Sequence, residues 1–454
     1  MKENLEKENG FRFWILVWGL GLAGQLCWNI ENQWFNTFIY AKIAKDSDIV
    51  TLMVITSALV TTFSTFFFGT LSDRKGTRRR FISLGYILWG IFTIIFGLTE
   101  FLNGGTVGAG TKFGLLAAVL VILADDVMSF FGSMGNDSGY NAWTNDMTTN
   151  RNRGQIGAAL ATQPVIGTIV GTVLGGMLIG DNDNYQRLFW SMGVFVIAMG
   201  FLSLLFLRNS KELKPYKDGS FWRQFSRVFG FKNFFSRKEM VLVCVTTAIF
   251  FISFNVYFVY MGNWMIYHLG FTAASMGILQ GVGLMAAMLL AIPAIRFINQ
   301  NKTPYVGAAA IILNLIGLCL LYLFAKPGAM DTANIFSSAN ILLLVSIFLA
   351  GAGYVLIIQA MTMWVKQLYP AENRGQFEGV RVMFFTLIPM IIGSIIGNAV
   401  IKNGTGTVVN EYGITENIPT ESIFLWAAIL VILTFIPLFF AARQYNRRIK
   451  ERNT

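Results

Sequence analysis

The sequence predicts an all-α integral membrane protein in which twelve transmembrane helices form two six-helix halves. Three observations lead to this fold class. Of 454 residues, 54% are hydrophobic and only 13% are charged, which is too apolar for an ordinary soluble protein. The apolar residues come in runs of about 20 or more, the length that crosses a bilayer. Most lysines and arginines lie in alternate connections between these runs, as expected for cytoplasmic loops.

The apolar runs define the expected spans and their orientation. Both termini are placed in the cytoplasm, and a plasma-membrane location is expected. The runs that exceed a minimal span are expected to tilt or to protrude. The twelve spans lie at roughly residues 11–40, 49–72, 80–100, 114–147, 153–180, 187–207, 240–267, 272–298, 304–325, 338–366, 375–402 and 421–442.

A basic segment divides the chain into two halves. Residues 1–207 form the first half, residues 208–239 a cytoplasmic linker, and residues 240–454 the second half. Within the linker, Trp222 and Phe225 recur at helical spacing among lysines and arginines. This pattern predicts an amphipathic helix at the inner surface of the membrane.

Composition also excludes several classes of function. The net charge of +11 comes from lysines and arginines that concentrate in the expected cytoplasmic segments. This distribution orients a membrane protein and does not indicate nucleic-acid binding. The three cysteines stand alone in apolar runs and His268 is the single histidine, a pattern that indicates no metal site and no nucleophilic catalysis. No P-loop pattern occurs, so ATP is not expected to act on this chain. We therefore expect no enzyme activity, no cofactor and no bound metal.

The most specific motif joins the second and third spans. It reads Gly-Thr-Leu-Ser-Asp-Arg-Lys-Gly-Thr-Arg-Arg-Arg from Gly69 to Arg80. Five cations between two apolar runs predict a cytoplasmic loop, and a plain basic loop is the alternative interpretation. Gly76 permits a sharp turn, and Asp73 is suited to face the positive end of a helix.

This stretch resembles the loop signature of the major facilitator superfamily, from which Thr77 alone departs. The resemblance implies a secondary transporter whose halves rock around a central site. It also implies a cytoplasmic gate, in which Asp73 meets the start of the eleventh helix near Asn373. The residues assigned to this gate are Gly69, Asp73, Arg74, Gly76, Arg78, Arg374, Glu378 and Arg381. Glu378 and Arg381 are one helical turn apart and are predicted to form an ion pair.

The two halves show traces of an internal repeat. Trp143 and the stretch Asn-Arg-Gly-Gln at 152–155 recur as Trp364 and residues 373–376, both shifted by 221 positions. Parallel halves of this kind are typical of the same superfamily.

Polar residues follow one face of the predicted first helix. Gln25, Asn29, Asn32 and Asn36 are spaced at i, i+4, i+7 and i+11, with Trp28 and Glu31 beside them. Such residues are costly against lipid, so this face is expected to line the bundle interior and to contribute to substrate binding. Hydrogen bonding between helices is the alternative.

The fourth helix carries carboxylates within apolar sequence. Because a buried ionised carboxylate must take up a proton, pair or bind a cation, Glu31, Asp125 and Asp126 are predicted to couple to a cation, with a proton preferred to sodium and Asp126 the first choice. The stretch from Asn136 to Trp143 is similar to the fourth helix of sugar symporters of the glycoside–pentoside–hexuronide branch. That resemblance implies that Asp137 contributes to sugar and cation binding. Asn141, in the same stretch, is a further candidate for substrate binding. The branch's paired aspartates on the second helix have no counterpart at residues 50–68.

Two further helices complete the predicted site. In the fifth, glycines at 167, 171, 175 and 176 resemble the antiporter motif of drug exporters, with Thr172 in place of its proline and Ala158 in place of its first glycine. Close helix packing is the preferred interpretation of these glycines. In the seventh, Tyr257 and Tyr260 are expected to face the substrate cavity. Interfacial anchoring accounts for the aromatics farther out.

Together these patterns predict a transporter of a small organic solute. The leading interpretation is a sugar or glycoside moved with a coupling cation. Proton-driven export of drug-like amphipathic compounds is the alternative. Membrane lipids are the other expected partners, nucleic acid is not, and a monomer is expected.

Overall fold

The protein is described by a computed structural model that covers residues 10–103, 112–149, 152–217, 219–226, 234–368, 379–409 and 415–453. Within these residues, twelve helical spans are long and apolar enough to cross a membrane. They are Phe11–Ile43, Ser47–Lys75, Arg79–Leu102, Leu116–Asp146, Gly154–Ile179, Tyr185–Phe206, Lys238–His268, Ala273–Ile298, Thr303–Phe324, Ser338–Gln367, Gly379–Lys402 and Ser422–Glu451. The predicted fold class is confirmed, and most predicted boundaries agree within a few residues.

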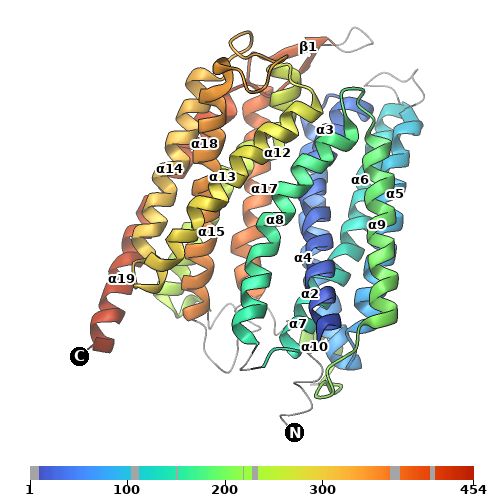
Figure 1. The fold of residues 1–454 in the computed structure, drawn as a ribbon, viewed down its shortest axis with the longest axis vertical. Helices are drawn as coiled ribbons and strands as arrows, with labels where there is room; N and C mark the ends of the chain where they lie inside the picture. The colour runs from blue at the N-terminus through green and yellow to red at the C-terminus, as the bar shows by residue number, and fades with distance from the viewer. Residues whose placement is uncertain are drawn as a thin grey trace. The chain divides into compact units, whose positions relative to one another are not determined.

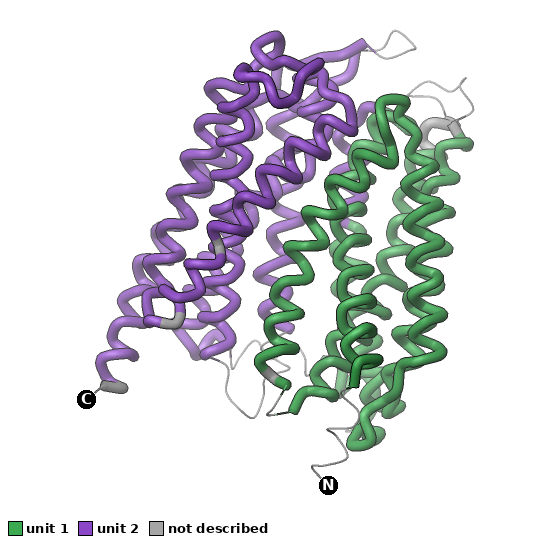
Figure 2. Tube along the Cα trace, viewed as in Figure 1, with its two compact units in different colours: residues 1–44, 56–227 green, residues 45–55, 228–454 purple. Residues whose placement is uncertain are grey.

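The chain divides into two compact units, shown in green and purple in Figure 2. Unit 1 comprises residues 1–44 and 56–227, and unit 2 comprises residues 45–55 and 228–454. The boundary between residues 227 and 228 falls inside the predicted linker, residues 208–239. Residues 45–55 come from the first half of the sequence but group with unit 2.

Unit 1 is built on two long helix pairs. Helix α5 (Arg79–Leu98) packs along α9 (Tyr185–Phe206), and α2 (Phe11–Ile30) packs along α8 (Arg153–Ile179) (Figure 1). The remaining helices and turns of the unit are η1 (Glu31–Phe35), α3 (Asn36–Phe38), η2 (Ile39–Ile43), α4 (Ser47–Lys75, of which residues 56–75 belong here), η3 (Thr99–Asn103), α6 (Lys112–Gly132), η4 (Ser133–Tyr140), α7 (Asn141–Asp146) and α10 (Phe221–Ser226). Aromatic rings fill its core; Phe35 stacks on Phe96 with ring centroids 3.9 Å apart.

Unit 2 is also mainly helical and has its own pairs of long helices. Helix α14 (Thr303–Phe324) packs along α15 (Ile341–Gln367), and α12 (Lys238–Asn263) packs along α17 (Ile388–Lys402). The other helices and turns are η6 (Trp264–His268), α13 (Ala273–Asn299), η7 (Ser338–Asn340), η8 (Met383–Leu387), α18 (Ser422–Leu433) and α19 (Phe435–Asn453). A hairpin that the sequence analysis did not predict pairs β1 (Thr407–Val409) antiparallel with β2 (Thr415–Asn417). Its strands of three residues are too short for an alternating pattern to indicate them.

Side chains of residues 45–55 form hydrogen bonds within unit 2. Asp48, in the first turn of α4, accepts hydrogen bonds from Nδ2 of Asn398 over 2.7 Å and from Nζ of Lys402 over 2.5 Å. One turn along, Oγ1 of Thr51 lies 2.6 Å from Oη of Tyr260. Tyr260 in turn donates to the carbonyl oxygen of Ser394 over 3.0 Å.

Among the residues that the structure describes, five segments depart from regular α-helix into the wider π form: η1, η2, η4, η6 and η8. Insertions of this kind shift the face that the following residues present, and they are frequent at functional sites. Two of the five, η1 and η4, hold several of the predicted site residues. The regular spacing assumed for the polar face of the first helix is therefore broken between Glu31 and Phe35.

The predicted amphipathic linker helix is present only in part among the described residues. Helix α10 covers six residues, and residues 227–233 lie outside the described part of the chain. Its aromatic side is packed, since Phe221 contacts Phe67 with ring centroids 5.2 Å apart.

Candidate functional site

Four carboxylates gather in the interior of unit 1. Glu31 lies in η1, Asp125 and Asp126 in α6, and Asp137 in η4. Glu31 interacts electrostatically with Asp126 and Asp137, and Asp125 interacts with Glu31 and Asp126. We call these four residues the acid cluster. None of them pairs with a lysine, an arginine or His268 within the described part of the chain.

Two serines hold one oxygen of Glu31. Ser57 of α4 and Ser129 of α6 both donate to Oε1 of Glu31, over 2.9 and 2.8 Å, and their own oxygens lie 3.0 Å apart. The second oxygen, Oε2, is buried and has no hydrogen-bond partner among the described residues. Glu31 itself is 7% exposed. The role of Ser57 could not be predicted from the sequence, because hydroxyl residues are common in membrane helices and their spacing alone marks no site.

Asp125 is the most enclosed member of the cluster. It is 1% exposed, and neither of its carboxylate oxygens has a hydrogen-bond partner in regular geometry among the described residues. Ser57 is close enough to interact with it, but that hydroxyl is directed to Glu31. Asp126 differs, since it is half-buried and Thr56 lies beside its carboxylate. A charge at Asp125 would thus be deprived of both water and partners, which is the costly arrangement.

Asp137 lies at the edge of the cluster beside an indole ring. Nδ2 of Asn136 donates to its Oδ1 over 3.3 Å, and Ser133 and Trp28 lie next to the carboxylate. The ring of Trp28 contacts Trp89 at 4.8 Å between centroids. The result is a half-buried carboxylate next to an aromatic face.

Several of the amide side chains predicted to bind substrate instead donate hydrogen bonds to backbone carbonyl groups one turn earlier in the chain. Nδ2 of Asn32 donates to the carbonyl oxygen of Trp28 over 2.6 Å, and Nδ2 of Asn36 donates to that of Asn32 over 2.8 Å. Asn141 is exposed, and its Nδ2 donates to the carbonyl oxygen of Asp137 over 3.1 Å. These bonds satisfy carbonyl groups beside the π-helical turns, where the regular i to i−4 bonds are lost.

The other first-helix amides face α8. Gln25 packs against Gly167, and a Cβ atom at Gly171 would meet Oδ1 of Asn29 at 2.5 Å. Thr172 donates to Oε1 of Gln33 over 2.8 Å, with Asn29 Oδ1 at 3.4 Å. The glycines of α8 thus allow α2 to approach closely. This approach supports the helix-packing alternative both for the amides of the first helix and for the glycines of the fifth.

The two predicted tyrosines lie in unit 2 and are fully buried. Tyr257 is 3% exposed and its hydroxyl lies beside Asn314. Tyr260 is 0% exposed, and its hydroxyl bonds to Thr51 and Ser394. These contacts are the ones expected of buried tyrosines whose hydroxyl groups must be satisfied.

The basic loop forms an ion-pair network inside unit 1. Nη2 of Arg78 lies 2.6 Å from Oδ1 of Asp73, and Nε of Arg78 lies 2.8 Å from Oδ2 of Asp146. Burial of Arg78 opposes its charge, but the hydrogen bond with Asp146 and the charges of Asp73 and Asp146 outweigh burial and raise the pKa of Arg78 above its ordinary value. The sequence does not indicate the pairing of Arg78 with Asp146, because the two residues are 68 positions apart.

The remaining gate residues have varied surroundings. Arg74 donates through Nη1 to the carbonyl oxygen of Gly219 over 2.9 Å and to Oε1 of Gln224 over 3.0 Å. Gly76 has a positive φ of 63°, as expected for the turn, whereas a Cβ atom at Gly69 would meet only an ordinary contact at 3.6 Å. Arg381 lies over the ring of Phe385 at 5.1 Å. The predicted partners Asn373, Arg374 and Glu378 lie outside the described residues.

Comparisons with known proteins agree with this architecture. The model of the family described as Major Facilitator Superfamily matches residues 22–332 and residues 243–454. A comparison with curated proteins finds no match. A mutant form of nucleoside transporter NupG is similar over 95% of this chain and 100% of its own, with a TM-score of 0.70 and 11% identity.

Two further crystal structures show the same fold. The unmutated nucleoside transporter NupG covers 96% of this chain and 99% of its own length, with a TM-score of 0.65 and 11% identity. A bacterial homologue of the human lysosomal transporter Spinster, inward-facing and unoccupied, covers 97% of this chain and 98% of its own length. Its TM-score is 0.67 and its sequence identity is 13%. Since the family model spans more than half of the chain, the protein belongs to the major facilitator superfamily and is an integral membrane transporter of small solutes, not an enzyme.

Proposed function

We propose that this transporter couples the movement of a sugar-containing solute to a cation, and that the cation is a proton held by the acid cluster. The observation that carries the proposal is the Asp125 carboxylate, which is 1% exposed and makes no hydrogen bond of regular geometry among the described residues, with Ser57 as its neighbouring hydroxyl group. Such a group is stable only when it is protonated or bound to a cation. A transporter that alternately exposes it to the two sides of a membrane would carry that cation across.

The surroundings favour Asp125 and Glu31 over Asp126 as the ion-binding pair. Asp126 is half-buried and has Thr56 beside it, so its charge is better tolerated. Oε2 of Glu31, both oxygens of Asp125 and Oδ1 of Asp126 are buried acceptors, but of these three residues only Asp126 is not buried as a whole. A proton needs only one such oxygen. A metal ion needs several ligands at once.

We assign the solute to the region of Asp137 and Trp28. A carboxylate and a neighbouring amide, here Asn136, accept and donate hydrogen bonds to hydroxyl groups, and an indole face packs on a sugar ring. The resemblance of residues 136–143 to the glycoside–pentoside–hexuronide symporters supports the same class. Nucleosides, which also contain a sugar, belong in the test because the similar fold of NupG is that of a nucleoside transporter.

Several finer assignments remain part of the proposal. Thr56 and Ser57 of α4 contribute hydroxyl groups to the acid cluster at the helix where those symporters carry paired acids.

We omit Tyr257 and Tyr260 from the binding residues because packing and hydrogen bonds already account for them. We also propose a plasma-membrane location, cytoplasmic termini and a monomer.

The test is solute accumulation in proteoliposomes containing the purified full-length protein. Labelled sugars, glycosides and nucleosides are offered under an inward proton gradient, under an inward sodium gradient, and with the proton gradient collapsed by a protonophore. We expect one of the three solute classes to accumulate, and to do so only when the proton gradient is present. Asp125→Asn should lose accumulation but retain exchange of labelled for unlabelled solute, because exchange needs no net ion movement.

The matched control is Asp181→Asn, which makes the same change at an exposed acid between α8 and α9. It should accumulate solute like the wild type. Full accumulation by Asp125→Asn would overturn the assignment of the ion site. Accumulation that requires the sodium gradient would identify sodium, rather than a proton, as the coupling ion. Expulsion of cationic dyes, with no sugar or nucleoside transported, would favour the exporter alternative.

A further inference from the structure

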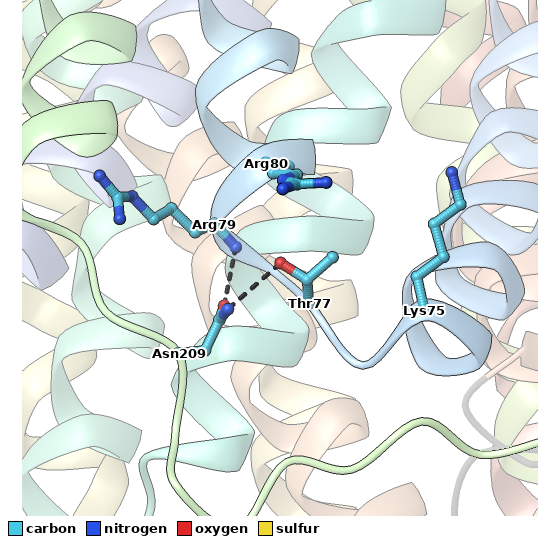
Figure 3. A pocket seen from close by; sticks show the side chains of 5 residues that line it. All are labelled: Lys75, Thr77, Arg79, Arg80 and Asn209. Carbon is cyan, nitrogen blue, oxygen red and sulfur yellow. Dashed lines mark hydrogen bonds between the residues drawn. The ribbon is translucent and has the colours of Figure 1, made fainter.

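A basic cavity lies at the end of unit 1 that carries the loop between α4 and α5. Its volume is about 410 Å³, and five residues line it: Lys75, Thr77, Arg79, Arg80 and Asn209 (Figure 3). Three of the five are cations and none is an acid. The acid cluster and the proposed solute site use none of these residues, so a ligand in this cavity is independent of the proposed function.

The walls of the cavity are held in place by the turn and by the chain that follows α9. A Cβ atom at Gly76 would come within 2.7 Å of Pro215, so the two segments are in close contact. Oδ1 of Asn209 accepts from the backbone N–H groups of Arg78 and Arg79, both over 2.9 Å. Its Nδ2 lies 3.2 Å from Oγ1 of Thr77. Asn209 therefore fixes the start of α5 and one wall of the cavity together.

The charges of the cavity are not neutralised by the protein. Arg78, in the same loop, is paired with two aspartates, but Lys75, Arg79 and Arg80 form no ion pair among the described residues. The guanidinium of Arg79 is turned to the carbonyl oxygen of Leu204, with Nε at 3.1 Å. In Figure 3, Arg80 lies above Thr77, with Lys75 to the right and Arg79 to the left. Lys75 and Arg80 are exposed and available to a ligand.

We propose that this cavity binds a phosphate group. Guanidinium and ammonium groups pair with phosphate oxygens through charge-assisted hydrogen bonds, and the adjacent Thr77 hydroxyl adds a neutral donor. Helix α5 begins at Arg79, so its positive end adds to the same field. The volume suits one small polar group rather than a polymer.

The exposed apolar face of α5 beside the cavity favours an anionic phospholipid as the source of the phosphate group. Leu84 lies one turn after Arg80 on α5, and Ile91 and Ile95 continue the same face; their exposed fractions are 53%, 38% and 40%. A headgroup in the cavity would place an acyl chain along this apolar face. A soluble phosphate ester shares the headgroup chemistry without the chain.

The experiment compares bound ligands by native mass spectrometry of the purified full-length protein. The probes are phosphatidylglycerol, phosphatidylcholine, glycerol 3-phosphate and inorganic phosphate. Lys75→Gln/Arg80→Gln should bind phosphatidylglycerol about tenfold more weakly than the wild type, the effect of losing charged hydrogen bonds. The control Lys217→Gln/Arg223→Gln removes the same charge from exposed residues that do not line the cavity, and should bind like the wild type.

Each outcome decides the proposal. Preference for phosphatidylglycerol over phosphatidylcholine, lost only in the cavity variant, supports a lipid site. Binding of glycerol 3-phosphate or inorganic phosphate that displaces the lipid, and is lost in the same variant, supports a site for soluble phosphate. Equal loss in the control variant, or equal binding of the two lipids by the wild type, overturns it. Unfolding temperatures of both variants verify that they are folded.

Discussion

Ser57 and Glu31 join α4 to η1 through a hydrogen bond of 2.9 Å inside the acid cluster. The apolar part of α4 contains no acid, yet its hydroxyl groups at positions 56 and 57 lie against Asp126 and Glu31. Six residues before Ser57 on the same helix, Thr51 belongs to unit 2 and contacts Tyr260.

Asp137→Asn should weaken solute binding by about tenfold or more while leaving the fold intact. The carboxylate would lose its charge next to Trp28, and a charged acceptor contributes about 1.5–3 kcal/mol to a hydrogen bond. Binding of a transported solute is measured by calorimetry or by tryptophan fluorescence. Asn141→Ala is the control, since Asn141 is exposed and bonds to its own helix. An unchanged dissociation constant for Asp137→Asn would place the solute elsewhere.

Tyr260→Phe should lower stability rather than solute affinity. Removing the hydroxyl leaves the carbonyl oxygen of Ser394 and the hydroxyl of Thr51 without this partner in a buried place, at a cost of about 1–3 kcal/mol. Thermal unfolding in detergent reports the change. Tyr305→Phe removes a hydroxyl from a residue that is 69% exposed and should leave the unfolding temperature unchanged. A stable variant with weakened binding would instead restore Tyr260 to the substrate site.

The Arg78 network should respond unequally to loss of its two acids. Asp146→Asn is expected to destabilise more than Asp73→Asn, since the Asp146 side chain is 24% exposed and that of Asp73 is 44% exposed. Arg78→Gln should cost the most, about 1–3 kcal/mol, because two carboxylates then face each other without a cation. Unfolding temperatures of the three variants test the order. A larger effect of Asp73→Asn than of Asp146→Asn would contradict it.

Glu421, just before α18, should make stability depend on pH. Burial opposes its ionisation, but hydrogen bonds from Lys326, the backbone and His268 outweigh burial and lower the pKa of Glu421. The ionised form therefore stabilises the fold above the unfolded-state pKa of about 4.3, and this stabilisation is lost as the pH falls through the lower folded-state value.

The measurement is the unfolding temperature between about pH 6 and pH 3. The wild type should lose more stability over this range than Glu421→Gln, which cannot ionise. Glu212→Gln removes an exposed acid and should follow the wild-type curve. Parallel curves for the wild type and Glu421→Gln would show that the ion pairs with Lys326 and His268 contribute nothing.

The orientation of the chain is tested by cysteine labelling in intact cells. Among the native cysteines, Cys27 and Cys244 are buried and Cys319 is exposed, so Cys319 is first replaced by serine. A membrane-impermeant reagent should then label Asp181→Cys from outside but fail to label Lys217→Cys, because basic segments remain on the cytoplasmic side. External labelling of Lys217→Cys would reverse the proposed orientation.

The sequence identifies the polar groups of the acid cluster but not how they are paired. An acid within an apolar run is visible in the sequence, and Glu31, Asp125, Asp126 and Asp137 were all expected to be important. The spacing of amides along the first helix predicted a single binding face, whereas Asn32 bonds to the backbone of Trp28. A regular helix was assumed there, and the π-helical turn η1 changes which face each residue presents.

The sequence by itself determined the twelve spans, because crossing a bilayer demands about 20 apolar residues regardless of what those residues contact. It also determined the turn at Gly76, where the local motif suffices. Only the tertiary structure decided that Ser57 and Ser129 hold Glu31, that Arg78 pairs with Asp146, and that residues 45–55 belong to unit 2. Hydropathy is a property of each segment, whereas a hydrogen bond between helices depends on how two segments distant in the chain are packed together.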